Sequence, residues 1–222
     1  MQRNRISLVF GGSGFIGSNI SKHFTTKLVK HKVIGRKECD LTNKGEVLEL
    51  LNLFRDYELD VVFTSSIVRK REDSINSQIL NISMVKNLTE IIEGFNIRSF
   101  IFLSSIDVYH EGEEEFNENS PTSSISPYAI SKLESEKILN DLLANKLTIL
   151  RIPGVYGPND NSNSVVGHLT KKILNKETVE VTNNGTQTRD YLYVDDISRA
   201  VSSLIKKPCD GICRSFKRTR AT

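Results

Sequence analysis

The feature that most constrains the fold is a run of glycines directly after the first apolar segment of the chain. Residues 6–10 are apolar and predict a short strand, and residues 11–17, with the sequence GGSGFIG, follow them. Helical periodicity then continues from about residue 14 to about residue 28. A strand, a glycine turn and a helix in this order are typical of the first unit of a parallel α/β sheet.

Gly11, Gly14 and Gly17 have the spacing G-x-x-G-x-x-G, a variant of the dinucleotide fingerprint. A turn without side chains lets the backbone approach a pyrophosphate, and the helix N-terminus adds free N–H groups and a positive dipole end. A glycine-rich loop can also be merely flexible. This one lies at the strand–turn–helix junction that the fingerprint requires, so we predict a dinucleotide-binding turn.

Apolar runs and helical periodicities alternate along the rest of the first 152 residues. Further strands are expected at residues 32–35, 60–64, 100–103 and 147–152, and further helices at residues 43–55, 75–94 and 126–145. This alternation predicts an α/β fold, a Rossmann-type doubly wound parallel sheet over residues 1–152. Glycine, proline and asparagine become frequent after residue 153, so we expect a small substrate lobe, interleaved with the sheet, over residues 153–212.

Composition excludes several classes of protein. The net charge is only +3, and the basic tail over residues 213–222 contributes four of the cations without an acid, so no nucleic-acid partner is expected. The first apolar run is too short for a signal peptide, and no stretch approaches the roughly 18 apolar residues of a membrane helix. The three cysteines do not form a metal-ligand pattern. We therefore expect a cytoplasmic protein with no membrane segment and no metal.

The end of the second expected strand bears on which dinucleotide binds. An acid at this point would accept a hydrogen bond from the ribose 2′-hydroxyl of NAD. The strand instead ends in Gly35, followed by Arg36 and Lys37. A cation here suits the 2′-phosphate of NADP, although a solvated surface pair gives the same pattern. The expected cofactor is NAD or NADP, with NADP favoured.

A second candidate site comes from Tyr128 and Lys132, within the sequence SPYAISK. Ser126 suits an N-cap and Pro127 the first helical position, which puts Tyr128 in the first turn. Residues four apart lie on one face of a helix, where an ammonium can stabilise a phenolate. The phenol could then exchange a proton with a carbinol or a carbonyl. The spacing alone is also common on exposed amphipathic helices.

The strand expected at residues 100–103 ends in Ser104 and Ser105. Ligands bind at the carboxyl ends of parallel strands, and a serine there can hydrogen-bond a reacting oxygen, although it can also simply cap the strand. The predicted catalytic residues are therefore Ser105, Tyr128 and Lys132.

Together these segments resemble the extended short-chain dehydrogenase/reductase family, which contains NAD-dependent nucleotide-sugar epimerases, dehydratases and 4-keto-sugar reductases. Six motifs match in the family's order: residues 11–17, 40–41, 104–109, 128–132, 155–158 and 189–196. The resemblance implies an NAD(P)-dependent epimerase or reductase of a nucleotide-activated sugar, of a kind used in polysaccharide biosynthesis. Hydride would transfer at a sugar carbinol or ketone, with the tyrosine as acid/base.

The resemblance also implies roles by position. The cofactor would be bound by Gly11, Ser13, Gly14, Phe15, Ile16, Gly17, Arg36, Asp40, Leu41, Tyr128 and Lys132. Asp40 and Leu41 would contact its adenine and Lys132 its ribose. Asn81, Ser105 and Arg189 would contact the substrate, with Arg189 near its diphosphate.

The chain departs from the family at two informative points. Dehydratases usually carry an Asp-Glu pair after the catalytic hydroxyl, where this chain has Ile106 and Asp107. Loss of the first acid argues against a 4,6-dehydratase and leaves epimerase and reductase. The short loop from Arg36 to Asp40 resembles the reductases, whereas the residues around the catalytic candidates resemble the epimerases.

The last departure is at the C-terminal end, because family members continue considerably beyond residue 212. We expect a truncated or frame-shifted chain, with an incomplete substrate lobe and a non-native tail over residues 213–222; the alternative is a naturally short member. The alternative function is a non-catalytic NAD(P)-binding remnant or regulator. By resemblance, the chain is expected to form a homodimer.

Overall fold

The computed structural model describes residues 4–69, 71–110, 117–123, 125–160, 164–179, 189–209 and 211–214. Most of the acidic stretch around residues 111–116, and residues 215–222 of the basic tail, therefore lie outside the described residues. Six strands form one parallel sheet, in the order β2-β1-β3-β4-β5-β8. They are β1 (Arg5–Phe10), β2 (His31–Ile34), β3 (Glu58–Phe63), β4 (Ile97–Ser105), β5 (Leu147–Ile152) and β8 (Gly211–Arg214).

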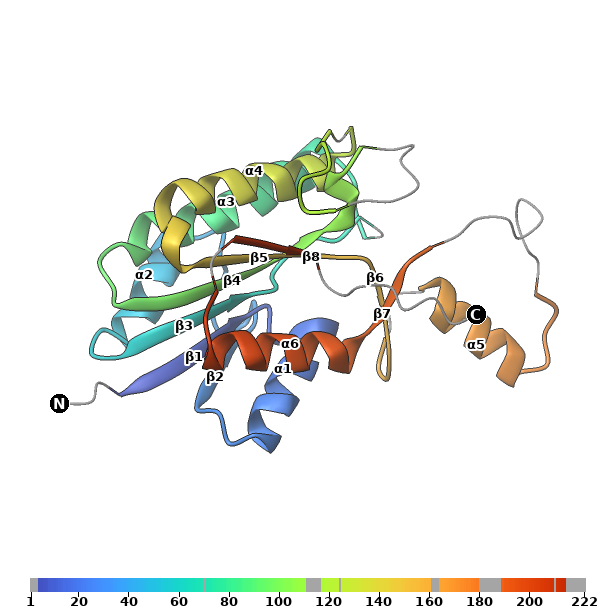
Figure 1. Ribbon diagram of the computed structural model, residues 1–222, viewed down its shortest axis with the longest axis horizontal. Coiled ribbons are helices and arrows are strands. Elements are labelled where there is room, and N and C mark those ends of the chain that lie inside the picture. The colour runs from blue at the N-terminus through green and yellow to red at the C-terminus, as the bar shows by residue number, and fades with distance from the viewer. Residues whose placement is uncertain are drawn as a thin grey trace.

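Helices cover both faces of the sheet, as the doubly wound fold predicted (Figure 1). On one face lie α2 (Lys44–Asn52), α3 (Ile75–Ile92) and α4 (Pro127–Leu143), and on the other lie α1 (Phe15–Thr26) and α6 (Val194–Lys206). A single-turn 3-10 helix, η1 (Ile106–Val108), follows β4, and another, η2 (Ala144–Lys146), follows α4. The α/β fold class is confirmed, and the predicted element boundaries differ from the observed ones by a few residues.

Each face of the sheet has its own hydrophobic core, because alternate strand side chains point to opposite faces. One core contains the buried rings of Phe10, Phe63 and Phe100 and the inner faces of α2, α3 and α4. The other contains Phe24 of α1 and Val201 of α6. Strands buried on both faces read as continuous apolar runs, which is why the sequence identified them.

The chain changes direction across the sheet between β1 and β3. From β1 it passes to β2 on one side and then returns to β3 on the other side of β1. Two neighbouring crossovers therefore lead away from each other at the carboxyl ends of β1 and β3. Open α/β sheets bind ligands at this switch point.

A buried ionic cluster holds the opposite edge of the sheet to α6. Asp60 of β3 is fully buried and accepts hydrogen bonds from Arg5 Nε at 2.5 Å, Arg98 Nε at 3.0 Å and Ser99 Oγ at 2.5 Å. Both arginines also donate to the carbonyl oxygen of Ile205, near the end of α6. Because these contacts join the sheet to the last turn of a helix, we assign the cluster a role in stability.

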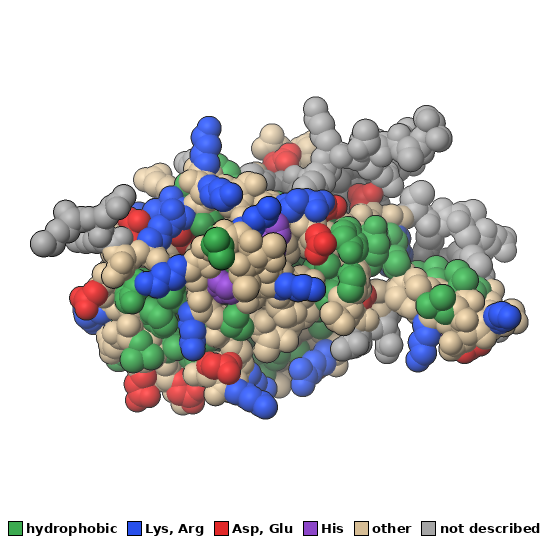
Figure 2. Space-filling model, turned by 90° about the horizontal axis from the view of Figure 1, so that it is seen from below, with side chains coloured by type: hydrophobic (Ala, Val, Ile, Leu, Met, Phe, Trp, Pro, Cys, Tyr) green, Lys and Arg blue, Asp and Glu red, His purple; other side chains and the backbone are tan. Residues whose placement is uncertain are grey.

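The segment between β5 and α6 contains fewer and shorter regular elements than the sheet domain. Two three-residue strands, β6 (Gly154–Tyr156) and β7 (Tyr191–Tyr193), pair in parallel, and α5 (Val165–Leu174) lies between them in sequence. Figure 1 shows α5 set apart from the sheet, and Figure 2 shows it as a separate protrusion. β8 reaches Arg214, two residues beyond the predicted end of the substrate lobe at Ile212.

None of the described helices is long and apolar enough to cross a membrane. Within the described ranges, no three His, Cys, Asp or Glu side chains lie together as metal ligands would.

Candidate active site at the carboxyl edge of the sheet

The glycine turn presents bare backbone at the switch point. Gly11 has φ +77°, a conformation that side chains disfavour. A Cβ on Gly17 would lie 2.4 Å from the carbonyl oxygen of Gly11, so only glycine allows this approach of α1 to the turn. Gly14 is the N-cap of α1, and no side chain caps the helix. This cradle fits a pyrophosphate, since the first amides of α1, from Phe15 and Ile16 onward, have no side-chain acceptor.

The loop after β2 is organised by its acids. Glu38 Oε2 accepts a hydrogen bond from the Gly35 amide at 2.8 Å. Asp40 accepts from the amide and hydroxyl of Thr42, at 3.0 and 2.7 Å, and these hydrogen bonds lower the pKa of its carboxyl. Arg36, with its side chain 82% exposed, donates to Asp40 at 3.2 Å. The predicted phosphate-binding arginine is therefore accessible, but it already has a carboxylate partner.

Two other predicted cofactor contacts differ in exposure. Ser13 is exposed at the tip of the glycine turn, beside Gly35. Leu41 is only 5% exposed and belongs to the core over α2 and α3. Its side chain therefore contributes mainly to packing.

The predicted catalytic residues meet where β4 ends and α4 begins. The Tyr128 hydroxyl hydrogen-bonds to the side chains of Ser66 and Ser105. Lys132 Nζ lies 5.7 Å from the centre of the Tyr128 ring and donates to the Leu103 carbonyl at 2.9 Å. The tertiary fold thus brings Ser105 together with Tyr128 and Lys132, which the sequence predicted from a separate motif.

The first turn of α4 is fixed from two sides. The Ala129 amide donates to Ser126 Oγ at 3.2 Å, which confirms the predicted N-cap. The Tyr128 amide donates to Asp73 Oδ1 at 2.9 Å, from the loop before α3. Because these two backbone amides are hydrogen-bonded, the position of the Tyr128 backbone, from which its side chain extends, is fixed.

Burial shifts the pKa values of the tyrosine and the lysine in opposite directions. It raises the pKa of Tyr128, and the negative charge of Asp107 raises it further, while the hydrogen bonds from Ser66 and Ser105 lower it. Burial lowers the pKa of Lys132 to about 8, and Glu136 opposes this change. The phenol alone is therefore protonated at neutral pH, and it needs nearby positive charge to ionise.

Asn81 holds the loop after β3 against α4. Its Oδ1 accepts from the Ile67 amide at 2.7 Å, and its Nδ2 donates to the Ile67 carbonyl at 3.0 Å and to Ser131 Oγ at 3.4 Å. Ile67 follows Ser66, which hydrogen-bonds to Tyr128. The predicted substrate contact of Asn81 is thus accompanied by a structural role.

Sequence reasoning missed Ser66, Asp73 and Glu136. Ser66 could have been found because it follows β3 at the same edge of the sheet as Ser105. Asp73 has no local signal, since its partner Tyr128 is 55 residues away in sequence.

Arg189 belongs to a later part of the chain than β4 and α4. It precedes β7, which pairs with β6, and its side chain is exposed. In β6 and β7, the ring of Tyr156 packs against those of Tyr191 and Tyr193, with ring centres 6.5 and 5.5 Å apart.

A pocket of about 510 Å³ lies between the segment after β6 and α5, lined by residues that include Tyr156, Asp160 and Lys171.

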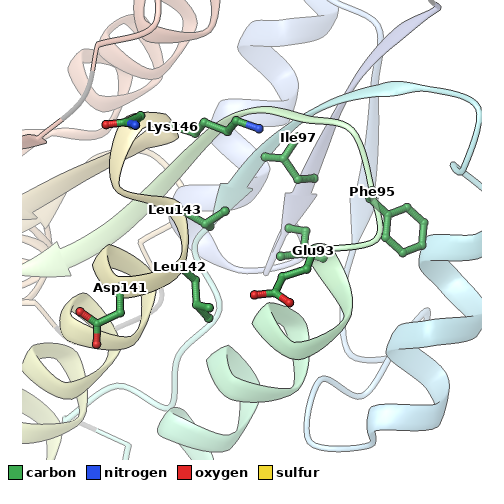
Figure 3. Close-up of a pocket in the computed structure, with 9 residues that line it drawn as sticks. Glu93, Phe95, Ile97, Asp141, Leu142, Leu143 and Lys146 are labelled. Carbon is green, nitrogen blue, oxygen red and sulfur yellow. The ribbon is translucent and has the colours of Figure 1, made fainter.

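Another pocket, of about 390 Å³, opens at the opposite edge of the sheet (Figure 3). It is lined by the ends of α3 and α4 and the start of β4, including Glu93, Phe95, Ile97, Leu142 and Lys146. None of the predicted site residues lines it. It is therefore separate from the candidate active site.

The chain is similar to known proteins in both sequence and fold. The sequence model of the NAD dependent epimerase/dehydratase family matches residues 7–214. Protein CapI of Staphylococcus aureus is 31% identical over an alignment of 240 positions, which covers 90% of this chain and 69% of that protein. The UDP-glucose 4-epimerase of Thermotoga maritima, solved with UDP-glucose, aligns with a TM-score of 0.81 at 27% identity, covering 93% of this chain and 75% of that one.

The dTDP-D-glucose 4,6-dehydratase of Dictyostelium discoideum is also similar, with 25% identity over 239 residues. The alignment covers 90% of this chain but only 55% of the Dictyostelium protein.

Proposed function

Because the chain belongs to the NAD dependent epimerase/dehydratase family, we propose that it is an NAD(P)-dependent epimerase or reductase acting on a nucleotide-activated sugar. Membership of this family, and relatives named as UDP-glucose epimerases, support modification of a sugar nucleotide. The main support for the finer proposal is the meeting of Tyr128 with Ser105 and Lys132 at the carboxyl edge of the sheet.

In this proposal Tyr128 Oη exchanges a proton with the reacting sugar oxygen. Ser105 Oγ, which shares a hydrogen bond with the phenol, would orient that oxygen. Lys132 lies against the Tyr128 ring, and its ammonium would stabilise the phenolate that burial disfavours. A bound nicotinamide would supply the site for hydride transfer.

The residues of the glycine turn fit the cofactor pyrophosphate. Gly11, Gly14 and Gly17 keep the turn tight and free of side chains, and Lys132 would contact the nearby ribose. We propose that NADP is preferred to NAD, because the exposed Arg36 guanidinium could bind the 2′-phosphate. To do so, Arg36 would have to give up its hydrogen bond to Asp40. Replacing Arg36 with alanine should then weaken NADPH binding and leave NADH binding unchanged.

Epimerisation or reduction is preferred to dehydration because of Ile106. Its side chain offers no carboxyl group at the position where dehydratases carry an acid. Asp107 follows it and is exposed. On the substrate side, Asn81 and Arg189 remain the proposed contacts, and a guanidinium at residue 189 suits a diphosphate.

Two measurements on the purified chain test the proposal. In the first, NADH and NADPH are titrated into the protein, and binding is detected by the fluorescence of the cofactor. The second measures turnover of UDP-, dTDP- and GDP-linked sugars and of their 4-keto forms. Cofactor binding with turnover of at least one sugar supports the proposal. Binding without turnover supports a non-catalytic NAD(P)-binding protein, and failure to bind either cofactor overturns both.

A further inference from the structure

A buried ion pair lies directly behind the candidate active site, and the chemistry proposed above does not use it. Glu136 of α4 and Arg151 of β5 each have a side chain only 5% exposed. Arg151 Nη2 donates to Glu136 Oε2 at 2.6 Å, and Arg151 Nε donates to Glu136 Oε1 at 3.1 Å. Ser104 Oγ donates to the same Oε1 at 2.5 Å. The carboxylate is therefore removed from water and held by donors from two strands.

This carboxylate lies one helical turn beyond the candidate catalytic lysine. Lys132 Nζ donates to the carbonyl of Leu103, and Glu136 accepts from the next residue of β4, Ser104. Successive turns of α4 thus bind successive residues of β4. The residue that follows is Ser105, so these two contacts set how far the end of β4 reaches along α4.

Among the described residues, few charged groups influence Lys132. On α4 they are Glu136 and, if ionised, Tyr128; Phe102 of β4 contributes only its ring, 5.0 Å from Nζ. Arg151 of β5 is paired with the Glu136 carboxylate, and Asp107 of η1 raises the pKa of Tyr128. Glu136 is thus the anion that favours the charged form of Lys132, against the burial that disfavours it.

We propose that Glu136 is a positioning residue, which keeps Lys132 protonated and sets the register of Ser105 against Tyr128. The proposal rests on the proposed function for its catalytic meaning, although its electrostatic part concerns the folded chain alone. A merely structural ion pair would stabilise the fold equally between pH 6 and pH 10. A carboxylate that supports Lys132 instead changes the pH at which this lysine loses its proton.

The electrostatic part is tested without substrate, by the free energy of unfolding of the full chain between pH 6 and pH 10. The unfolded chain holds the lysine proton up to about pH 10.4, so stability rises with pH once the folded protein releases it above about pH 8. In Glu136→Gln, which keeps the shape but loses the charge, this rise should begin about one pH unit lower. Glu134→Gln is the matched control, because Glu134 is on the same helix but is partly exposed and paired with Lys137.

The positioning part is tested by turnover of the sugar nucleotide that the wild-type chain accepts. In Glu136→Gln the alkaline limb of kcat should move down by about one pH unit. Ser104→Ala, which removes one contact to the carboxylate and no charge, should lower kcat about tenfold without moving the limb or KM.

Two results would overturn the proposal: a loss of stability in Glu136→Gln that is equal at every pH, or an unchanged kcat in Ser104→Ala. If Glu136→Gln does not fold, the double variant Glu136→Gln/Arg151→Met replaces it, since this removes the cation left without a partner. If the wild-type chain binds neither cofactor, the proposed function fails, and the unfolding measurement still decides whether Glu136 and Lys132 are coupled.

Discussion

The carboxyl edge of the sheet and the α5 segment are built in opposite ways. At the edge, polar side chains are buried and hydrogen-bonded: Ser105 is 8% exposed, and Asn81 and Lys132 are each 5% exposed. In α5 no residue is buried, and Ile173 and Leu174 are 66% and 77% exposed. Figure 2 shows hydrophobic side chains together with lysines on this protrusion.

The difference shows where the geometry of each region comes from. Burying a polar group costs free energy unless it is paired, so each side chain at the edge is held in one position by its partners. α5 is stabilised mainly by its own hydrogen bonds and by its N-cap, Ser164, which accepts from the Gly167 amide at 3.0 Å. Substitutions at the edge should therefore change chemistry and stability strongly, and substitutions in α5 should change them little.

Tyr128→Phe should give the largest effect. The variant keeps the ring beside Lys132 but removes the only proposed proton-transfer atom, so kcat should fall by roughly 10³-fold. NADPH affinity should change by less than about threefold, since the glycine turn is untouched. Tyr191→Phe in β7, a partly exposed ring, is the control, and an equal loss of kcat in both variants would contradict the assignment.

Gly17→Ala should be the next largest effect. The added methyl group would lie within 3 Å of backbone atoms of Gly11 and Gly12, which cannot move aside as a side chain can. We expect a loss of about 3 kcal/mol in the free energy of unfolding, together with loss of cofactor binding.

The matched substitution in the other region is Gly167→Ala. There the nearest atom is Ser164 Oγ at 3.0 Å, and alanine is the better helix former. The change should be within about 1 kcal/mol by urea unfolding. A similar cost for both alanines would show that the glycine turn is less tightly packed than the structure indicates.

The same contrast explains what the sequence could predict. The sheet was predictable because strands buried on both faces are continuous apolar runs, and because glycines and the Ser126–Pro127 pair mark helix starts locally. The catalytic candidates were predictable because Ser105 ends a strand and Tyr128 begins a helix. Each signal lies within a few residues of the feature that it marks.

The remaining features depend on contacts between distant residues. Asp73 reaches Tyr128, and Arg151 reaches Ser104's partner Glu136, only through the packing of α4 on the sheet. β6 and β7 have three residues each and pair Val155 with Leu192, so neither shows a period in the sequence. α5 was not predicted, because the sequence indicated only a small lobe rich in glycine, proline and asparagine after residue 153.

Lys132→Met should raise the free energy of unfolding at neutral pH and abolish turnover. The folded pKa of about 8 lies below the unfolded value of about 10.4, so the protonated lysine destabilises the fold below pH 8, and this cost disappears as the pH rises between the two values. At pH 7 the variant should gain roughly 2 kcal/mol in unfolding free energy, after loss of the bond to Leu103. The gain should vanish above about pH 10, while turnover is lost at every pH. A variant less stable than wild type at pH 7 would contradict this balance.

Leu174→Ala in α5 should have the smallest effect. Its side chain is 77% exposed, so truncation removes little buried area, and alanine favours the helix. We expect a change in unfolding free energy within about 0.5 kcal/mol. Leu139→Ala is the same substitution at a fully buried position of α4, where a cavity should cost about 3 kcal/mol. If Leu174→Ala costs as much as Leu139→Ala, the exposed face of α5 is covered in solution, and the contrast between the two regions no longer holds. If only Leu139→Ala is costly, α5 can accept substitutions along its exposed face without loss of the site at the carboxyl edge.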